Sequence, residues 1–129
     1  MAVASELNQP RLIVVDDDKN CRVLLSRILA EMGCDVIEAS GGHEALQEIY
    51  NTQFDLVFTD LNMIGMDGWK LAQNIRRFNR FIPIVMVTGD EKGTIMKKIR
   101  NSGVDDVIFK PFNIDDIEEI LTKMALMGK

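Results

Sequence analysis

Charged and hydroxyl side chains follow four short apolar segments of this 129-residue chain. They are Asp16 and Asp17 after residues 12–15, Thr59 and Asp60 at the end of 55–59, Thr88 at the end of 82–88, and Lys110 and Pro111 after 106–109. Carboxylates that lie close together cannot all ionise readily without a counter-charge. A hard divalent cation such as Mg²⁺ supplies that charge through oxygen ligands. If the fold brings these segments together, the residues therefore predict a magnesium site.

A carboxylate, a hydroxyl and a lysine beside a divalent cation favour phosphoryl transfer onto a carboxylate. A carboxylate can act as a nucleophile and form an acyl phosphate. The protein then has to position the phosphoryl group and neutralise its oxygens. Lys110 would supply a positive charge and Thr88 a hydrogen bond, while one aspartate attacks and the others hold the metal.

Each of these residues also has an ordinary structural explanation. Asp18, or Asp17, could cap the helix that follows. Asp60 could open a turn, and Thr88 could be a β-branched strand residue. Lys110 could be a surface lysine before a proline. Four strands that all end in such groups are poorly explained by coincidence, so we prefer the functional interpretation for the set and the capping interpretation for Asp18.

Hydrophobic periodicity alternates between strand and helix along the chain. It predicts strands at 12–15, 34–39, 55–59, 82–88 and 106–109, and helices at 19–33, 42–50, 67–78, 92–103 and 114–127. Alternation of this kind predicts an α/β fold with a parallel sheet and helices on both faces. Ligands of such sheets bind outside the carboxyl ends of the strands. The second strand ends without a charge, as suits an outer strand away from the site.

Composition limits the other function classes. The chain is 47% hydrophobic and 27% charged with a net charge of −5, which argues against direct nucleic-acid binding. No apolar run reaches the roughly 20 residues of a membrane span, so we expect no membrane insertion. Residues 1–9 are expected to be a disordered lead-in. Cys21 and Cys34 suggest reduced thiols in the cytoplasm, and His43 is expected at a surface helix start.

Four motifs give the chain a resemblance to a known family. They are "IVVDDD" (13–18), "DLVFTDLNMIGMDG" (55–68), "IVMVTGD" (84–90) and "DVIFKPF" (106–112). In this order and spacing they resemble the receiver domain of two-component response regulators, over nearly the whole chain. The resemblance implies a flavodoxin-like, doubly wound, five-stranded parallel sheet of order 2-1-3-4-5 with five helices, as a CheY-like receiver domain at residues 10–127.

The resemblance also implies a role for each site residue. Asp60 is the phosphoacceptor, Asp17 the direct acidic Mg²⁺ ligand, Asp16 a ligand mainly through water, Asn62 a ligand through its backbone carbonyl, Thr88 the switch hydroxyl and Lys110 the phosphoryl-contacting lysine. The Lys110–Pro111 bond is commonly cis in this family, which lets the lysine point into the site. Asp18 has no family role.

The function implied is that of a cytoplasmic signalling switch rather than a turnover enzyme. A histidine kinase or histidine phosphotransfer protein would donate a phosphoryl group to Asp60 with Mg²⁺, or Mn²⁺ in its place. The switch would catalyse its own phosphorylation and dephosphorylation and act on a protein target. We expect a stand-alone single-domain regulator, with an excised part of a longer protein as the alternative.

Four positions affect how this resemblance is applied. Ile64 stands where the family usually has proline, which should loosen the turn after the acceptor. Val107 replaces the usual Tyr or Phe, although Phe109 lies on the same strand face. Asn62 and Asp90 match a chemotaxis-type pair that helps orient a hydrolytic water, which predicts a short-lived phosphoryl group.

Two other functions compete with this interpretation. The chain could be a docking module that keeps the receiver fold without phosphorylation, an alternative that Val107 leaves open. A phosphatase of the haloacid dehalogenase kind would use Asp16 and Asp18, but Asn20 stands where Thr or Val is needed. The basic residues Lys92, Lys97, Lys98 and Arg100 mark either a solvated helix face, which we prefer, or a surface for an acidic partner.

Overall fold

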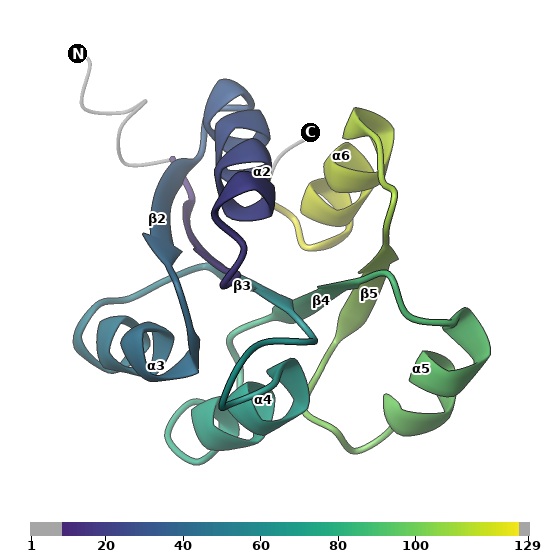
Figure 1. Cartoon of the computed structure of the whole chain (residues 1–129). Helices are drawn as coiled ribbons and strands as arrows, with labels where there is room; N and C mark the ends of the chain where they lie inside the picture. The colour runs from purple at the N-terminus through teal and green to yellow at the C-terminus, as the bar shows by residue number, and fades with distance from the viewer. Residues whose placement is uncertain (1–8, 127–129) are drawn as a thin grey trace.

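The computed structural model describes residues 9–126, which form one sheet with helices on both faces (Figure 1). The strands are β1 (Arg11–Val15), β2 (Asp35–Ala39), β3 (Leu56–Asp60), β4 (Ile84–Thr88) and β5 (Asp106–Phe109). The helices are α2 (Lys19–Glu31), α3 (Gly42–Asn51), α4 (Gly68–Arg76), α5 (Lys92–Lys98) and α6 (Ile114–Lys123). The predicted lead-in at 1–9, except Gln9, and the predicted ends of the domain and last helix at residue 127 lie outside the described residues.

All five strands are parallel and lie in the order β2-β1-β3-β4-β5, which confirms the predicted doubly wound sheet. Helices α2 and α6 cover one face, and α3, α4 and α5 cover the other (Figure 1). The uncharged strand β2 is at an edge, as predicted, and β5 is at the opposite edge. The carboxyl ends of β1 and β3 therefore lie side by side, with β4 next to β3.

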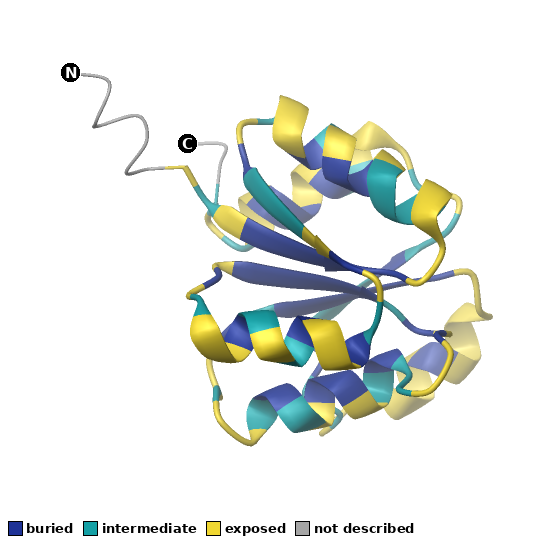
Figure 2. Cartoon of the chain, turned by 60° about the vertical axis from the view of Figure 1, so that its left-hand side comes forward, coloured by how far each residue is buried: buried dark blue, intermediate teal, exposed yellow. Residues whose placement is uncertain are grey.

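Two hydrophobic cores hold the strand ends in place, one on each face of the sheet. Along β1, Ile13 and Val15 enter one core, and Leu12 and Val14 enter the other. The three inner strands are dark along almost their whole length in Figure 2 because both of their faces are covered. This burial on both sides explains the continuous apolar runs that predicted the strands.

Side-chain caps begin two of the helices where the sequence predicted them. Asp18 caps α2, because its Oδ1 accepts a hydrogen bond of 3.0 Å from the backbone N–H of Asn20. Asn113 caps α6 through a reciprocal capping box with Asp116. The capping interpretation of the third aspartate of the "DDD" run is therefore confirmed.

The predicted helix at 92–103 is too long, since α5 ends at Lys98. Beyond it the chain continues in turns, with Asn101 at φ 62° and Gly103 at φ 92°. A right-handed helix cannot include residues with positive φ. Gly and Asn are the residue types that adopt a positive φ most readily. Within residues 9–126, no helix combines the length and the apolar character that a membrane crossing requires.

Candidate functional site

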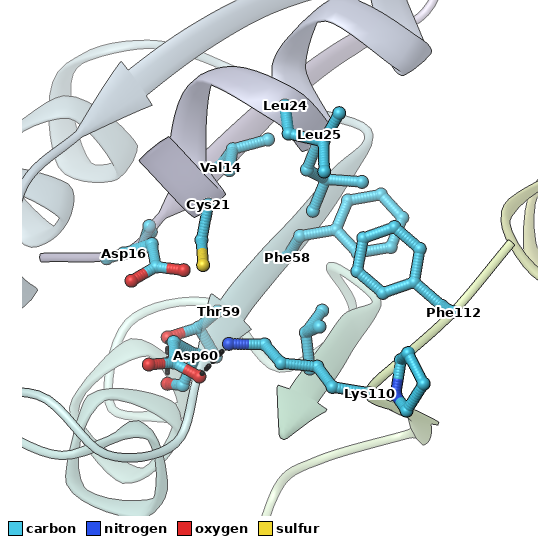
Figure 3. A pocket seen from close by; sticks show the side chains of 13 residues that line it. Val14, Asp16, Cys21, Leu24, Leu25, Phe58, Thr59, Asp60, Lys110 and Phe112 are labelled. Atoms are coloured by element: carbon cyan, nitrogen blue, oxygen red, sulfur yellow. Dashed lines mark hydrogen bonds and ion pairs between the residues drawn. The ribbon is translucent and has the colours of Figure 1, made fainter. Parts of the chain in front are cut away.

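Three carboxylates meet at the carboxyl edge of the sheet. Asp16 and Asp17 follow β1, and Asp60 ends β3; each offers one oxygen that lies within 4.8 Å of the other two. Asp16 is only 6% exposed, and the side chain of Asp60 is 12% exposed, whereas Asp17 is exposed. The predicted acidic cluster thus exists in the fold, and Figure 3 shows two of its members, Asp16 and Asp60, on the wall of a pocket.

Burial and like charge make the two inner carboxylates costly to ionise. Burial raises the pKa of Asp16, the N–H of Asp18 at 2.9 Å from Oδ1 opposes that rise, and the charge of Asp60 adds to it. Burial likewise raises the pKa of Asp60, against the opposing positive charge of Lys110. Lys110 supplies one positive charge against three carboxylates. Hard oxygen donors with this excess of negative charge fit Mg²⁺, which prefers such ligands.

Lys110 reaches back into the cluster from the end of β5. The Lys110–Pro111 peptide bond is cis, as expected, and Nζ lies 3.2 Å from Oδ1 of Asp60 (Figure 3). Burial alone would lower the pKa of Lys110, but the carboxylate of Asp60 outweighs it and raises the pKa. The lysine is therefore charged and directed at the predicted acceptor.

Thr88 ends β4 with its side chain buried, at 1% exposure. Its Oγ1 accepts a hydrogen bond of 3.1 Å from the N–H of Asp90, and its carbonyl accepts one of 2.8 Å from the N–H of Lys110. The side chain of Asp90 in turn accepts a 2.9 Å bond from Nδ2 of Asn62. The two members of the chemotaxis-type pair thus contact each other, and the metal role of the Asn62 carbonyl stays a prediction.

Hydrogen bonds join the loop 61–67, which follows the acceptor, to Asp17 and close the loop on itself. The N–H of Ile64, whose side chain is 92% exposed, donates a 2.8 Å hydrogen bond to Oδ2 of Asp17. At the end of the loop, the N–H of Gly68 donates to the carbonyl of Leu61 at 2.8 Å. Proline, the usual residue at position 64 in the family, has no backbone N–H. Ile64 therefore supplies a donor that proline would lack.

Gly68 is required by the close approach of α4 to the backbone of the acceptor strand. A Cβ at Gly68 would lie 2.6 Å from the carbonyl oxygen of Asp60 and 3.0 Å from Cα of Leu61. We expect Gly68→Ala to lower the free energy of unfolding by about 2 kcal/mol, because backbone atoms rather than a flexible side chain must move. Thermal or urea unfolding measures this change.

Gly41→Ala provides the control for that substitution. Gly41 also lies at a helix start, but no atom would lie within 4 Å of its added Cβ. Because Gly41 is the N-cap of α3, where Ala is less favourable than Gly, the unfolding free energy of this variant should fall, but by no more than about 1 kcal/mol. Equal losses in the two variants would contradict the close-packing explanation.

Val107 and Phe109 lie on one face of β5, as predicted. Both are half-buried and pack against the core under α3, α4 and α5, whereas Ile108 enters the opposite core. Pro111 is exposed. The effect of Val107 on signal readout stays a prediction.

Residues that the sequence analysis did not select complete the site on its α2 side. A cavity of about 210 Å³ is bordered by Cys21, Leu25 and Phe112 together with Asp60 and Lys110 (Figure 3). Position alone could have indicated Cys21, since it lies in the first turn of the helix after the "DDD" run. The apolar members gave no separate signal, because their spacing is that of ordinary core residues.

Comparison with known proteins decides the family. The model of the response regulator receiver domain matches residues 12–122. The chain belongs to this family. Chemotaxis protein CheY4 of Vibrio cholerae has a receiver-like structure with a TM-score of 0.85 and 27% identity, over 90% of this chain and 98% of that chain. This receiver domain also matches TrrA of Thermotoga maritima, solved with Mg²⁺–BeF, with a TM-score of 0.83 and 31% identity, over 90% and 99% of the two chains.

Curated relatives of this receiver domain are much longer proteins. The sensor histidine kinase RcsC of Escherichia coli K12 is 32% identical over 121 residues, which are 94% of this chain and 13% of that protein. Across the first curated relatives that match, the chain spans between 9% and 21% of their lengths.

Proposed function

We propose that this receiver domain is a Mg²⁺-dependent phosphoacceptor whose acceptor is Asp60. The observation that carries the proposal is the meeting of three carboxylate oxygens within 4.8 Å, with Lys110 directed at one of them from 3.2 Å. Asp60 is the carboxylate that both belongs to the cluster and contacts the lysine. A nucleophile needs a position of this kind, where charge of the incoming group can be neutralised on more than one side.

In the proposed reaction a carboxylate oxygen of Asp60 attacks the phosphorus of a phosphohistidine. The O–P bond of an acyl phosphate forms, the P–N bond breaks, and the histidine nitrogen that leaves takes up a proton. Lys110 and the hydroxyl of Thr88 then hold phosphoryl oxygens. Bound Mg²⁺ would neutralise charge on the phosphoryl oxygens. Asp17 would ligate the ion directly, Asp16 mainly through water, and Asn62 through its carbonyl.

The proposed donor is a histidine kinase or a histidine phosphotransfer protein. One relative, RcsC, is named a sensor histidine kinase, which supports a donor of this class. Contact of Thr88 and Lys110 with the phosphoryl group would pull together the ends of β4 and β5. The surface near β5 would then favour a second conformation that a protein target binds in the cytoplasm.

Acetyl phosphate is the donor for a direct test. The full chain is incubated with acetyl phosphate and Mg²⁺, and its intact mass is recorded. We expect an adduct of about 80 Da, one phosphoryl group in place of a proton, and its loss when EDTA removes the metal. No adduct with acetyl phosphate or a phosphorylated kinase would contradict the proposal and favour a phosphorylation-independent docking module.

The Asn62–Asp90 pair predicts the lifetime of the phosphoryl group. In the Asp90→Lys variant the hydrogen bond of 2.9 Å from Asn62 is lost, and a long cation occupies the region where an attacking water would be oriented. We expect the adduct to decay several-fold more slowly, as followed by intact mass after the donor is removed. Asp90→Asn keeps an oxygen acceptor for Asn62 and should decay at nearly the wild-type rate. An unchanged decay in Asp90→Lys would contradict the prediction.

A further inference from the structure

A groove of about 520 Å³ is lined by residues of α3 and of α4 with its flanking segments. Figure 1 shows these two helices on the same face of the sheet. Its lining includes His43, Leu46, Tyr50, Met66, Arg77 and Phe78. These residues belong to neither the acidic cluster nor the basic face of α5. The groove has a volume in the range of binding sites that hold several apolar atoms with a few polar groups.

Two aromatic side chains form one end of this groove. Tyr50 is 73% exposed and Phe78 is 41% exposed, and their rings meet edge to face with centroids 5.4 Å apart. Because each ring restricts the other, less side-chain freedom is lost when a partner binds than for two separate exposed rings. Exposed tyrosine and arginine are also the residue types that contribute most of the energy at protein interfaces.

Arg77 is the one residue of the groove lining that carries a full charge at pH 7. Arg77 and His43 are its only basic lining residues, and none of its lining residues is acidic. Within residues 9–126, no carboxylate lies within 4.0 Å of Arg77, whereas Arg22 and Arg76 each form a salt bridge. On a chain with a net charge of −5, this combination marks a local site for an anion.

We propose that this groove docks an acidic amphipathic segment of a partner protein. An apolar side chain of that segment would pack between Leu46 and the aromatic pair. An adjacent Asp or Glu would accept two hydrogen bonds from the guanidinium of Arg77, the geometry that arginine favours with carboxylates. With a single arginine and an apolar floor, the groove fits such a segment better than the phosphate backbone of a nucleic acid.

The groove ends at the loop that borders the acidic cluster. Met66 forms this end, and its side chain fills the space beside Gly42, where an added Cβ would lie 2.6 Å from Sδ. The same loop carries Ile64, which is bonded to Asp17. A segment seated in the groove would therefore contact the loop of the candidate phosphorylation site, and the proposal itself does not rest on phosphorylation of Asp60.

The test uses a library of random 16-residue peptides displayed on phage, selected against the full wild-type chain. We expect enriched peptides to place Asp or Glu beside Leu, Ile, Phe or Trp. Their affinity, measured by fluorescence anisotropy with synthetic copies, should fall at least tenfold for Arg77→Glu and at least fivefold for Tyr50→Ala. Both residues are exposed, so melting temperatures near the wild-type value should show that the variants remain folded.

Lys97→Glu is the matched control, since it makes the same charge change on the exposed face of α5. Peptides that bind the groove should keep their affinity for this variant within about twofold. Three results would each overturn the proposal. They are no enrichment of any peptide, equal losses with Lys97→Glu and Arg77→Glu, and enrichment of basic rather than acidic peptides.

Discussion

The Asp60→Asn variant should take up no phosphoryl group from acetyl phosphate and Mg²⁺, while the wild-type chain gains about 80 Da. An amide is a far weaker nucleophile than a carboxylate, and it cannot form an acyl phosphate at that position. The substitution preserves size and leaves an oxygen for the nearby Lys110 Nζ. The loss should therefore reflect chemistry rather than unfolding, and equal or higher melting temperatures would confirm that the variant is folded.

Asp55→Asn is the control for this loss. Asp55 precedes the same strand β3, so it lies at the amino ends of the strands, away from the acidic cluster. There its side chain accepts a 2.8 Å hydrogen bond from the N–H of Arg11. Because an amide oxygen can also accept that bond, the variant should form the full adduct. An adduct that persists in Asp60→Asn, or one that disappears in Asp55→Asn, would show that the acceptor has been assigned wrongly.

The Asp16→Asn variant should be more stable than the wild type without metal and should bind Mg²⁺ 10- to 100-fold more weakly. Burial raises the pKa of Asp16 above its ordinary value of 3.8. The folded protein then binds a proton there more tightly than the unfolded chain does, so wild-type stability falls as the pH rises from 3.8 through the folded-state pKa. At pH 7 the ionised carboxylate destabilises the metal-free fold.

The substituted amide carries no charge, and its oxygen can still accept the hydrogen bond from the Asp18 N–H. Without metal, we expect a gain in unfolding free energy on the order of 1 kcal/mol at pH 7. That gain should vanish below a pH of about 4, where Asp16 is protonated in both states. Urea unfolding with EDTA across this pH range measures the gain.

Magnesium should reverse the advantage of this variant. A ligand that binds only the folded state stabilises it by RT ln(1 + [L]/Kd), so a weaker site gives a smaller rise in melting temperature. Loss of an outer-shell group, such as a carboxylate that holds the ion through water, typically lowers metal affinity 10- to 100-fold. A variant that is less stable than the wild type in EDTA at pH 7, or one with wild-type Mg²⁺ dependence, would contradict the assignment of Asp16 to the metal site.

The sequence predicted the sheet well because apolar runs buried on both faces leave a clear pattern. The runs 12–15 and 55–59 each match the observed strand to within one residue, and their order along the chain follows from the alternation with helices. The spatial strand order came from the resemblance, since periodicity does not encode which strands are neighbours. Helix ends were less predictable, because the apolar spacing of Ile95 and Ile99 continues after α5 has ended at Lys98.

Site residues were predictable where a charge interrupts an apolar run, as at Asp16, Asp60 and Lys110. Contacts between loops were not predictable, because they depend on backbone donors that any residue other than proline possesses. The bond from Ile64 to Asp17 is one case, since the replacement of proline at position 64 predicted only a looser turn. The groove at Tyr50 and Phe78 was also missed, because two aromatics 28 positions apart share no periodicity.

The two sides of the candidate site differ: the Ile64–Asp17 hydrogen bond closes one of them, and a cavity borders the other. The bond joins residues that are 47 positions apart, so the segment after β1 and the loop after Asp60 are in contact on that side of the site. On the other side the cavity beside Cys21 and Phe112 leaves Asp60 accessible. We therefore expect a phosphoryl donor of the proposed kind to approach along α2 and past the end of β5, where this cavity is bordered by Cys21 and Phe112.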